Sequence, residues 1–291
     1  MTTSPERLPL GNKRVLLTGA SRGIGAVVAR SLAERGAELV LVARTEKHLN
    51  DVVASLENGP HSVVALDVRD AQAWDSAGAL IAPGGVLDAV VTAAAALAPI
   101  GPLGSWDIAA FRETLDINVC GTLLAVLAGL DGLRTTKGSI VTFSGGGATG
   151  PMRRFDAYAA SKAAVVRLTE NLATDLASDA IRANSVAPGF VLTSMHEATL
   201  AAGPEMVGQE YFEKTRGAVA GQIGDPPELA ADLVAFLVSD ESRGITGKLI
   251  SARWDPWREA AFQDRLRRES DLATLRRIDE QFFTTVSRIT K

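Results

Sequence analysis

The stretch "TGASRGIG", residues 18–25, follows a short apolar run and opens a helical pattern. Gly19, Gly23 and Gly25 allow the backbone to turn tightly and to approach a pyrophosphate, whose charge faces the helix N-terminus. A glycine triad alone is weak evidence for such a site. Here it lies at the first strand-to-helix junction of an alternating chain, and this context predicts a dinucleotide-binding fold.

Strand and helix patterns alternate along the chain. Several of the strand-like runs are apolar on both faces, which is typical of a parallel sheet covered by helices on each side. The alternation predicts an α/β fold, a single doubly wound Rossmann-type domain over residues 10–252. About seven strands are expected, at residues 13–19, 38–44, 62–68, 88–94, 139–144, 182–188 and 248–252.

Composition limits the class of protein. The 291 residues carry a net charge of −4 and are 46% hydrophobic, which is enough to form a core and excludes a disordered chain. The single cysteine, Cys120, excludes a disulfide framework, fits a reducing compartment and is expected in the core. No signal peptide and no run of about 18 uninterrupted apolar residues is found. We therefore expect a cytoplasmic protein with no nucleic-acid or membrane partner.

Two stretches interrupt the alternation of strand and helix. Residues 190–225 form a long excursion between the last two strands, and such loops are often active-site lids. Residues 253–291, with nine basic and seven acidic residues, are expected to form a C-terminal helical extension. This tail is expected to pack on the body or on a partner subunit, with substrate contact as the alternative. The apolar residues of the tail that are expected to make this packing contact are Trp254, Trp257, Leu266, Leu272, Leu275 and Ile278.

The second strand ends without an acidic residue. A carboxylate there would accept the ribose 2′-OH of NAD, whereas an arginine favours the 2′-phosphate of NADP. This chain has Arg44 at that point, and Arg22 lies inside the glycine loop. The two arginines predict that the cofactor is NADP(H).

Tyr158 and Lys162 lie four residues apart in a helical pattern, so both side chains share one face. A nearby ammonium lowers the pKa of a phenol from about 10 toward neutrality, which makes it a usable proton donor and acceptor. Such a pair alone is usually only a surface feature, but after a strand that ends in "FSGGG" and in a chain with "TGASRGIG" it predicts a general acid/base centre.

Over residues 10–252 the sequence resembles the short-chain dehydrogenase/reductase family. "TGASRGIG" matches the cofactor motif of that family and "YAASK", residues 158–162, matches its catalytic motif. Asn118 in "LDINVCG" and the turn in "VAPGFVLTSM", residues 186–195, also match.

The resemblance implies the roles of individual residues. Tyr158 would donate a proton to a carbonyl oxygen while NADPH delivers hydride to its carbon. Lys162 would bind the nicotinamide ribose and lower the Tyr158 pKa, and Asn118 would organise a proton-relay water. A homodimer or homotetramer is expected. The implied cofactor-binding residues are Gly19, Ser21, Arg22, Gly23, Ile24, Gly25, Arg44, Asp67, Val68, Ala93, Ala94, Tyr158, Lys162, Pro188, Gly189, Val191 and Thr193.

The chain departs from the family pattern at the end of the fourth strand. It has "TAAA", residues 92–95, where the family usually has "NNAG". Ala95 puts a methyl group near the adenosine ribose, and the missing asparagine removes a side-chain hydrogen bond. Each lost hydrogen bond costs about 1 kcal/mol, so altered cofactor contacts are expected.

A second departure concerns the catalytic serine, which in the family lies thirteen residues before the tyrosine. That position is Gly145 in "FSGGG", and Ser144 lies one residue earlier. A bulge at the strand end would turn Ser144 into the serine's role. Alternatively the backbone N–H groups of residues 145–147 form an oxyanion-type site, or substrate groups replace the serine. Ser144 is retained as the fourth catalytic candidate, beside Tyr158, Lys162 and Asn118.

We therefore expect an NADPH-dependent oxidoreductase that reduces a carbonyl of a small polar substrate or oxidises the corresponding secondary alcohol. One alternative is an epimerase, dehydratase or lyase that retains the cofactor without net redox. Another is a catalytically silent dinucleotide sensor, against which the Tyr158–Lys162 pair argues. The three histidines show no metal-ligand spacing, so no metal site is expected.

Overall fold

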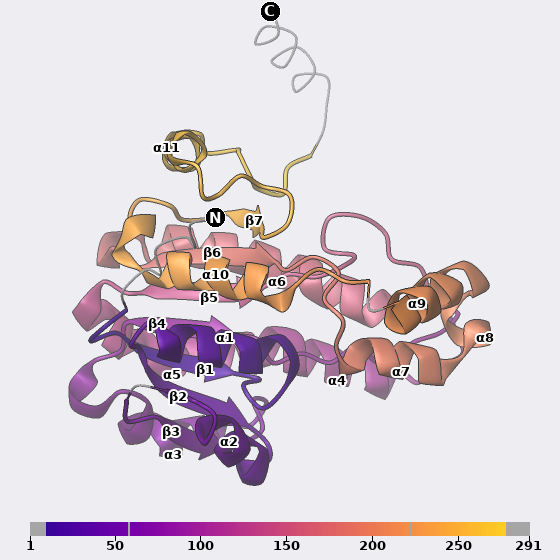
Figure 1. The fold of residues 1–291 in the computed structure, drawn as a ribbon, viewed down its shortest axis with the longest axis horizontal. Coiled ribbons are helices and arrows are strands. Elements are labelled where there is room, and N and C mark those ends of the chain that lie inside the picture. Colours follow the sequence, from indigo (N-terminus) through magenta and orange to yellow (C-terminus); the bar gives the residue numbers. More distant parts are fainter. Residues whose placement is uncertain (1–9, 58, 222, 278–291) are drawn as a thin grey trace, which may run out of the picture.

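The fold is a parallel seven-stranded sheet of order β3-β2-β1-β4-β5-β6-β7. The computed structural model describes residues 10–57, 59–221 and 223–277 (Figure 1). All seven predicted strands are confirmed, and so is the doubly wound class. The strands are β1 (Arg14–Thr18), β2 (Glu38–Ala43), β3 (Ser62–Ala65), β4 (Ala89–Thr92), β5 (Ser139–Phe143), β6 (Arg182–Ala187) and β7 (Leu249–Ser251).

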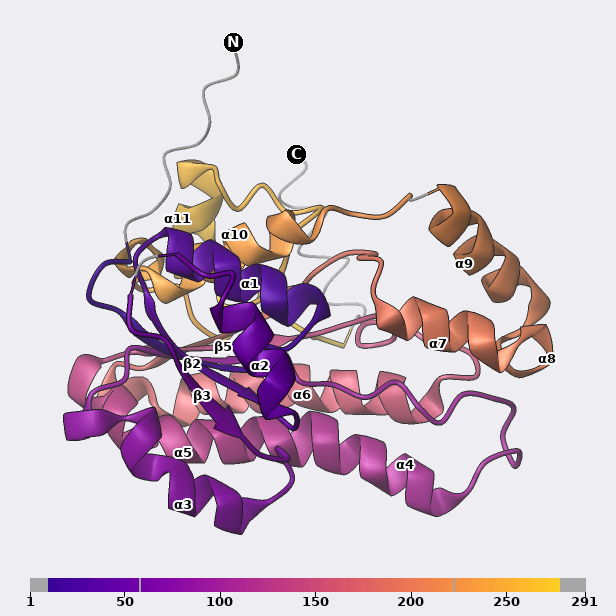
Figure 2. The same cartoon turned by 60° about the horizontal axis from the view of Figure 1, so that its bottom comes forward.

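Helices cover both faces of the sheet. Helices α1 and α10 pack together on one face, while α3, α5 and α6 lie on the other (Figures 1 and 2). The helices are α1 (Gly23–Glu34), α2 (Glu46–Val53), α3 (Ala71–Ile81), α4 (Ile108–Leu115), α5 (Gly121–Thr136), α6 (Asp156–Asp175), α7 (Ser194–Ala202), α8 (Pro204–Val207), α9 (Gln209–Gly221), α10 (Pro227–Val238) and α11 (Ala260–Arg268).

The strands are apolar throughout because successive side chains enter two different cores. In β1, Val15 and Leu17 join the cluster under α1 and α10, while Leu16 joins the cluster under α3 and α5. All three side chains are fully buried. The strand order reverses beside β1, where β4 follows on one side and β2 on the other. Ligands of such sheets bind at the carboxyl ends of the strands at this point.

Helices α4 and α5 are joined by a π-helical turn, Asp116–Cys120, into one helical run. This run, Ile108–Thr136, is long and apolar enough by composition to cross a membrane, a test that core helices of soluble proteins also pass. It is partly buried, with Ala125 and Leu133 packed in the core under α3 and α5. Cys120 is exposed, so the prediction of a core cysteine was wrong. An almost uniformly apolar helix does not reveal from sequence which face is buried.

Residues 190–225, the predicted lid, contain α7, α8 and α9. The segment stands apart from the sheet at one end of the molecule (Figure 2). Asp225 joins its two ends: the Phe190 amide donates to Asp225 Oδ2 at 2.7 Å, and the Asp225 amide donates to Phe190 O at 2.8 Å. Arg253 pairs with the same carboxylate at 3.2 Å, which ties the tail to the base of the lid.

The described part of the tail packs on the body of its own chain. In α11, Phe262 and Leu266 are buried in the α1–α10 core, and Leu272 packs against it. Trp257 lies against Phe236 of α10, with ring centroids 5.6 Å apart. Trp254, predicted as a second anchor, is 79% exposed. Ile278 lies outside the described residues.

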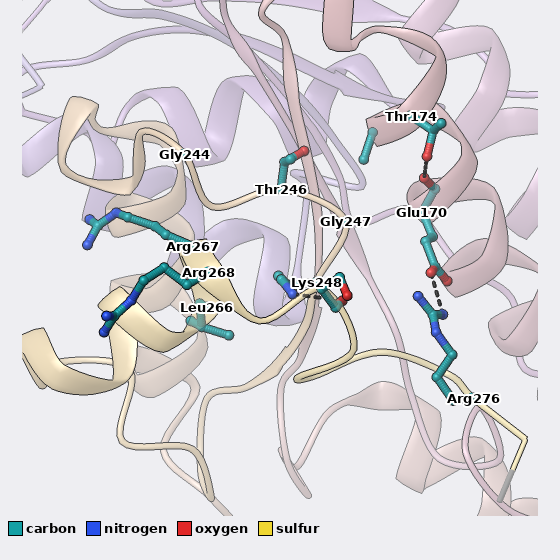
Figure 3. A pocket seen from close by; sticks show the side chains of 12 residues that line it. Glu170, Thr174, Gly244, Thr246, Gly247, Lys248, Leu266, Arg267, Arg268 and Arg276 are labelled. Atoms are coloured by element: carbon teal, nitrogen blue, oxygen red, sulfur yellow. Dashed lines mark hydrogen bonds and ion pairs between the residues drawn. The ribbon is translucent and has the colours of Figure 1, made fainter. Parts of the chain in front are cut away.

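The tail also borders a hollow of about 290 Å³ beside the C-terminal part of α6 and the start of β7 (Figure 3). The buried Lys248 ammonium donates there to the carbonyls of Glu269, Ser270 and Leu272 at 2.6–3.0 Å. Arg276 forms an ion pair with Glu170 on the other side. The hollow lies at the amino end of β7, at the opposite edge of the sheet from the glycine loop.

Candidate active site

The sheet brings four loops together at the carboxyl ends of β1, β4, β5 and β6. The glycine loop and "TAAA" touch: a Cβ on Gly19 would lie 2.5 Å from the Ala94 amide nitrogen. Gly19 has φ +67°, a conformation that favours glycine. The Ala94 amide donates to Thr18 Oγ1 at 3.3 Å. Ala93 and Ala94 therefore border the glycine loop, as the predicted cofactor contacts require.

The other two glycines of the loop also occupy positions that a side chain would disturb. A Cβ on Gly25 would lie 2.2 Å from Gly19 O, so only glycine allows α1 to begin this close to the loop. Gly23 has φ +57°, and its missing Cβ faces Thr193 at 3.6 Å. The chain thus forms a bare backbone cradle at the N-terminus of α1, and this fits a bound dinucleotide pyrophosphate.

Arg22 and Arg44 are both exposed and form no ion pair with the described residues. The charge of Arg44 is near enough to contribute to a lowered pKa of Asp67. The main cause of that lowering is Arg69, whose Nε and Nη2 donate to the Asp67 carboxylate at 3.0 and 2.7 Å. Asp67, one of the cofactor-binding residues that the resemblance implies, is therefore already engaged by an arginine.

Asn118 is fully buried in the π-helical turn. Its Oδ1 accepts from the Ala96 amide at 2.7 Å, and its Nδ2 donates to Ala96 O at 2.9 Å and to Ser161 Oγ at 2.8 Å. The side chain therefore joins the loop after β4 to α6, one residue before Lys162.

Lys162 is 5% exposed, and its Nζ donates to Phe143 O at the end of β5 at 2.9 Å. Burial lowers its pKa from 10.5 to about 8, so the side chain remains mostly protonated at pH 7. The ammonium lies 5.7 Å from the centroid of the Tyr158 ring.

The Tyr158 hydroxyl makes no hydrogen bond to the described residues, yet it is not sealed from solvent. Burial, with a smaller contribution from Tyr211, raises its pKa to about 12. The expected lowering toward neutrality is therefore wrong for the chain alone: Lys162 donates its hydrogen bond to a backbone carbonyl rather than to the phenol, and desolvation dominates. At neutral pH the phenol carries its proton and can donate it.

In the "SGGG" segment, residues 144–147, the position that faces the Tyr158 phenol is Gly145. A Cβ on Gly145 would lie 2.3 Å from Tyr158 Oη, so the hydroxyl occupies the space of the absent side chain. Ser144 is 4% exposed, and its hydroxyl makes no hydrogen bond to Tyr158 or Lys162. Among the described residues, no acceptor lies opposite the amide groups of residues 145–147. The structure thus brings Tyr158, Lys162 and Asn118 together, and leaves Ser144 without a link to them.

Thr193 and the "VAPG" turn border the cradle from the lid side. Thr193 is the N-cap of α7, and its Oγ1 accepts from the Met195 amide at 3.3 Å. Its methyl group faces Gly23, so the start of the lid meets the glycine loop. Gly189, with φ +86°, leaves room for Asp225, whose carboxylate a Cβ would meet at 2.3 Å. Pro188 and Val191 lie in the same turn.

Comparison with known proteins decides the family. The family model described as enoyl-(acyl carrier protein) reductase matches residues 19–252. Dehydrogenase/reductase SDR family member 4 of Oryctolagus cuniculus is 34% identical over 251 residues, 84% of this chain and 93% of that protein.

The chain belongs to the short-chain dehydrogenase/reductase family. It is an oxidoreductase of this family, which uses a nicotinamide dinucleotide. The cis-4-hydroxycyclohexanecarboxylate dehydrogenase of Sinomonas cyclohexanicum is also 34% identical, over 81% of this chain and 93% of that protein. The structure of a short-chain type dehydrogenase/reductase from Mycobacterium ulcerans has a TM-score of 0.73 at 28% identity, covering 84% of this chain and 89% of that one.

Sequence reasoning missed one residue that borders the site from the lid, Tyr211. Tyr211 of α9 packs its ring edge-on against Phe155, with centroids 5.2 Å apart. Arg154, in the loop before α6, donates to Met206 O at 3.3 Å and to Glu205 O, which ties α8 of the lid to that loop. Tyr211 is one of only two tyrosines, which is a weak signal that could have drawn attention to it.

The close approach at Gly145 generates a stability prediction. Gly145→Ala forces the Tyr158 phenol to move and should destabilise the protein by about 1–3 kcal/mol, the usual cost of overpacking. Gly146→Ala is the matched control, because its Cβ would meet only the flexible Met152 Sδ at 3.3 Å. Thermal unfolding should show a lower midpoint for the first variant alone, and equal midpoints would contradict the contact.

Burial of Lys162 generates a pH prediction. Because its pKa is about 8 in the folded protein and 10.5 in the unfolded chain, the unfolded state binds more protons between these values. Stability should therefore rise with pH from 8 to 10.5, by about 3 kcal/mol. Urea unfolding of the protein and of Lys162→Met across this range should show the rise in the first and not in the second. A parallel pH dependence in both would refute the assignment to Lys162.

Proposed function

We propose that this protein is an NADPH-dependent carbonyl reductase that acts on a ketone of a small polar substrate, or on the secondary alcohol in reverse. The observation that carries the proposal is the state of Tyr158: a protonated, unpartnered hydroxyl beside a buried ammonium, next to a dinucleotide cradle. A phenol in this state is a general acid.

In reduction, Tyr158 donates its proton to the carbonyl oxygen. The reduced nicotinamide, when bound, supplies the hydride that adds to the carbonyl carbon. The phenolate left on Tyr158 is stabilised by the positive charge of Lys162, whose ammonium is held in place by Phe143 O. The raised pKa of Tyr158 favours reduction at neutral pH, whereas alcohol oxidation requires the ionised phenol and is favoured by alkaline conditions.

The choice of NADPH over NADH rests on Arg22 and Arg44. Both side chains are exposed beside the cradle, and neither is neutralised by an acidic partner among the described residues. An arginine binds a phosphate through short, charge-assisted hydrogen bonds, which a 2′-hydroxyl cannot replace.

The substrate class is supported by the relative named cis-4-hydroxycyclohexanecarboxylate dehydrogenase, whose name describes a secondary alcohol on a ring that bears a carboxylate. A cyclic ketone or its alcohol with a further polar group is therefore the first class to screen.

Cofactor preference is tested by fluorescence titration with NADPH and NADH. The protein should bind NADPH more tightly, and Arg44→Ser should weaken NADPH binding about ten- to hundredfold, since a hydrogen bond to a charged group contributes about 1.5–3 kcal/mol. Binding of NADH should change little.

Arg134→Ser serves as the control, because it removes the same charge from the end of α5, where Arg134 pairs with Asp131 and Asp179. Equal affinity for the two cofactors, or loss of both in Arg44→Ser, would contradict the proposed 2′-phosphate contact. Tyr158→Phe should retain NADPH binding and lose ketone reduction.

A further inference from the structure

One side of the Tyr158 hydroxyl is closed. The backbone of Gly145 lies against Tyr158 Oη, so a substrate oxygen must approach the hydroxyl from another direction. Among the described residues, no side-chain hydroxyl donates a hydrogen bond to the Tyr158 phenol, since Ser161 Oγ donates to the backbone carbonyl of Tyr158 instead. A carbonyl oxygen that gains negative charge during hydride addition is stabilised by more than one donor in most such sites. The site therefore needs a second donor on its open side.

Tyr211 reaches the same end of α6 as Tyr158. Its ring contacts Phe155 at 5.2 Å, with an angle of 61° between the ring planes. Phe155 is fully buried and is the N-cap residue of α6, three residues before Tyr158. The aromatic contact thus places the lid tyrosine at the first turn of the helix that carries the general acid.

The two phenols also interact electrostatically. A charge on Tyr211 raises the pKa of Tyr158, so the two groups lie close enough to influence each other's ionisation. Burial raises the pKa of Tyr211 as well, and it is therefore a protonated donor at neutral pH. Its hydroxyl has no hydrogen-bond partner among the described residues and is not sealed from solvent. It is free to donate to a substrate.

Contacts beside Tyr211 hold this part of the lid in place. Arg154 donates to the carbonyls of Glu205 and Met206, which fixes α8 against the loop before α6. On α9, Thr215 lies one turn after Tyr211 on the same face, and its fully buried hydroxyl has no partner among the described residues. The face of α9 that carries Tyr211 is therefore packed against the protein.

We propose that Tyr211 is a second catalytic tyrosine, whose phenol donates a hydrogen bond to the carbonyl oxygen that Tyr158 protonates. Tyr211 thus supplies, from the lid, a hydrogen-bond donor where Gly145 has no side chain to provide one. This inference rests on the proposed carbonyl reduction. In that step the Tyr158 O–H bond breaks, the carbonyl oxygen takes the proton and the carbonyl carbon takes the hydride. Tyr211 keeps its proton throughout. Ketones whose oxygen fits between two phenols are therefore the preferred substrates.

The decisive comparison is between Tyr211→Phe and Tyr211→Leu. The first removes only the hydroxyl and keeps the ring contact with Phe155, whereas the second removes both. We expect kcat for ketone reduction to fall about 10²-fold in both variants, with NADPH binding unchanged. A Tyr211→Phe variant with the wild-type kcat would overturn the inference and leave the amide groups of residues 145–147 as the donors. A wild-type protein that reduces no ketone would instead refute the proposed function.

A second measurement does not depend on turnover. The chain has two tyrosines, so Tyr211→Phe leaves Tyr158 as the only phenol, and its ionisation can be followed by near-ultraviolet absorbance. We expect the Tyr158 midpoint to lie lower than in the wild-type protein, because the neighbouring tyrosinate has been removed. Tyr158→Phe assigns the other transition. A Tyr158 midpoint that is the same in both proteins would show that the phenols do not interact and would overturn the inference.

Discussion

The hydrogen bond from the buried Lys162 ammonium to Phe143 O is the interaction on which the site depends. It joins α6 to the end of β5 at the point where the strand gives way to three glycines. A buried ammonium is unfavourable unless it is partnered, so this bond fixes where α6 can lie. Tyr158, one turn earlier on the same face, is thereby held against Gly145. Burial of the Lys162 ammonium destabilises the fold, but it positions Tyr158, the general acid.

The glycines around the site serve close approach rather than flexibility. The missing side chain of Gly19 leaves room for the backbone of Ala94, and that of Gly25 leaves room for the backbone of Gly19. The missing side chain of Gly145 leaves room for the Tyr158 hydroxyl. In each case a methyl group would overlap an atom at 2.2–2.5 Å. The first contact joins the ends of β1 and β4, the second holds the start of α1 against the glycine loop, and the third joins the end of β5 to α6. The loss of the family serine therefore leaves no gap, because the phenol itself fills the space.

The strands and the main motifs were predictable because their signals are local. An apolar run on both faces predicts a covered parallel strand, and "TGASRGIG" after such a run predicts the cradle. The Tyr158–Lys162 pair follows from helical spacing together with the two glycine-rich motifs that precede it. The direction of the Tyr158 pKa was not predictable, because it depends on burial by residues distant in the chain. Tyr211 was missed for the same reason: its contact with Phe155 joins two segments that no sequence pattern links.

Deuterium transfer tests whether the reaction is a net reduction, in which hydride passes from the nicotinamide to the carbonyl carbon and Tyr158 gives its proton to the oxygen. Purified protein is incubated with a cyclic ketone and NADPH that carries deuterium at the transferable position of the nicotinamide, and the product is analysed by mass spectrometry. Net reduction requires one deuterium per product molecule, on the carbinol carbon, with one NADPH oxidised for each alcohol formed. Conversion of a substrate without net NADPH oxidation, or with deuterium retained on the cofactor, would contradict it and would indicate an epimerase, dehydratase or lyase.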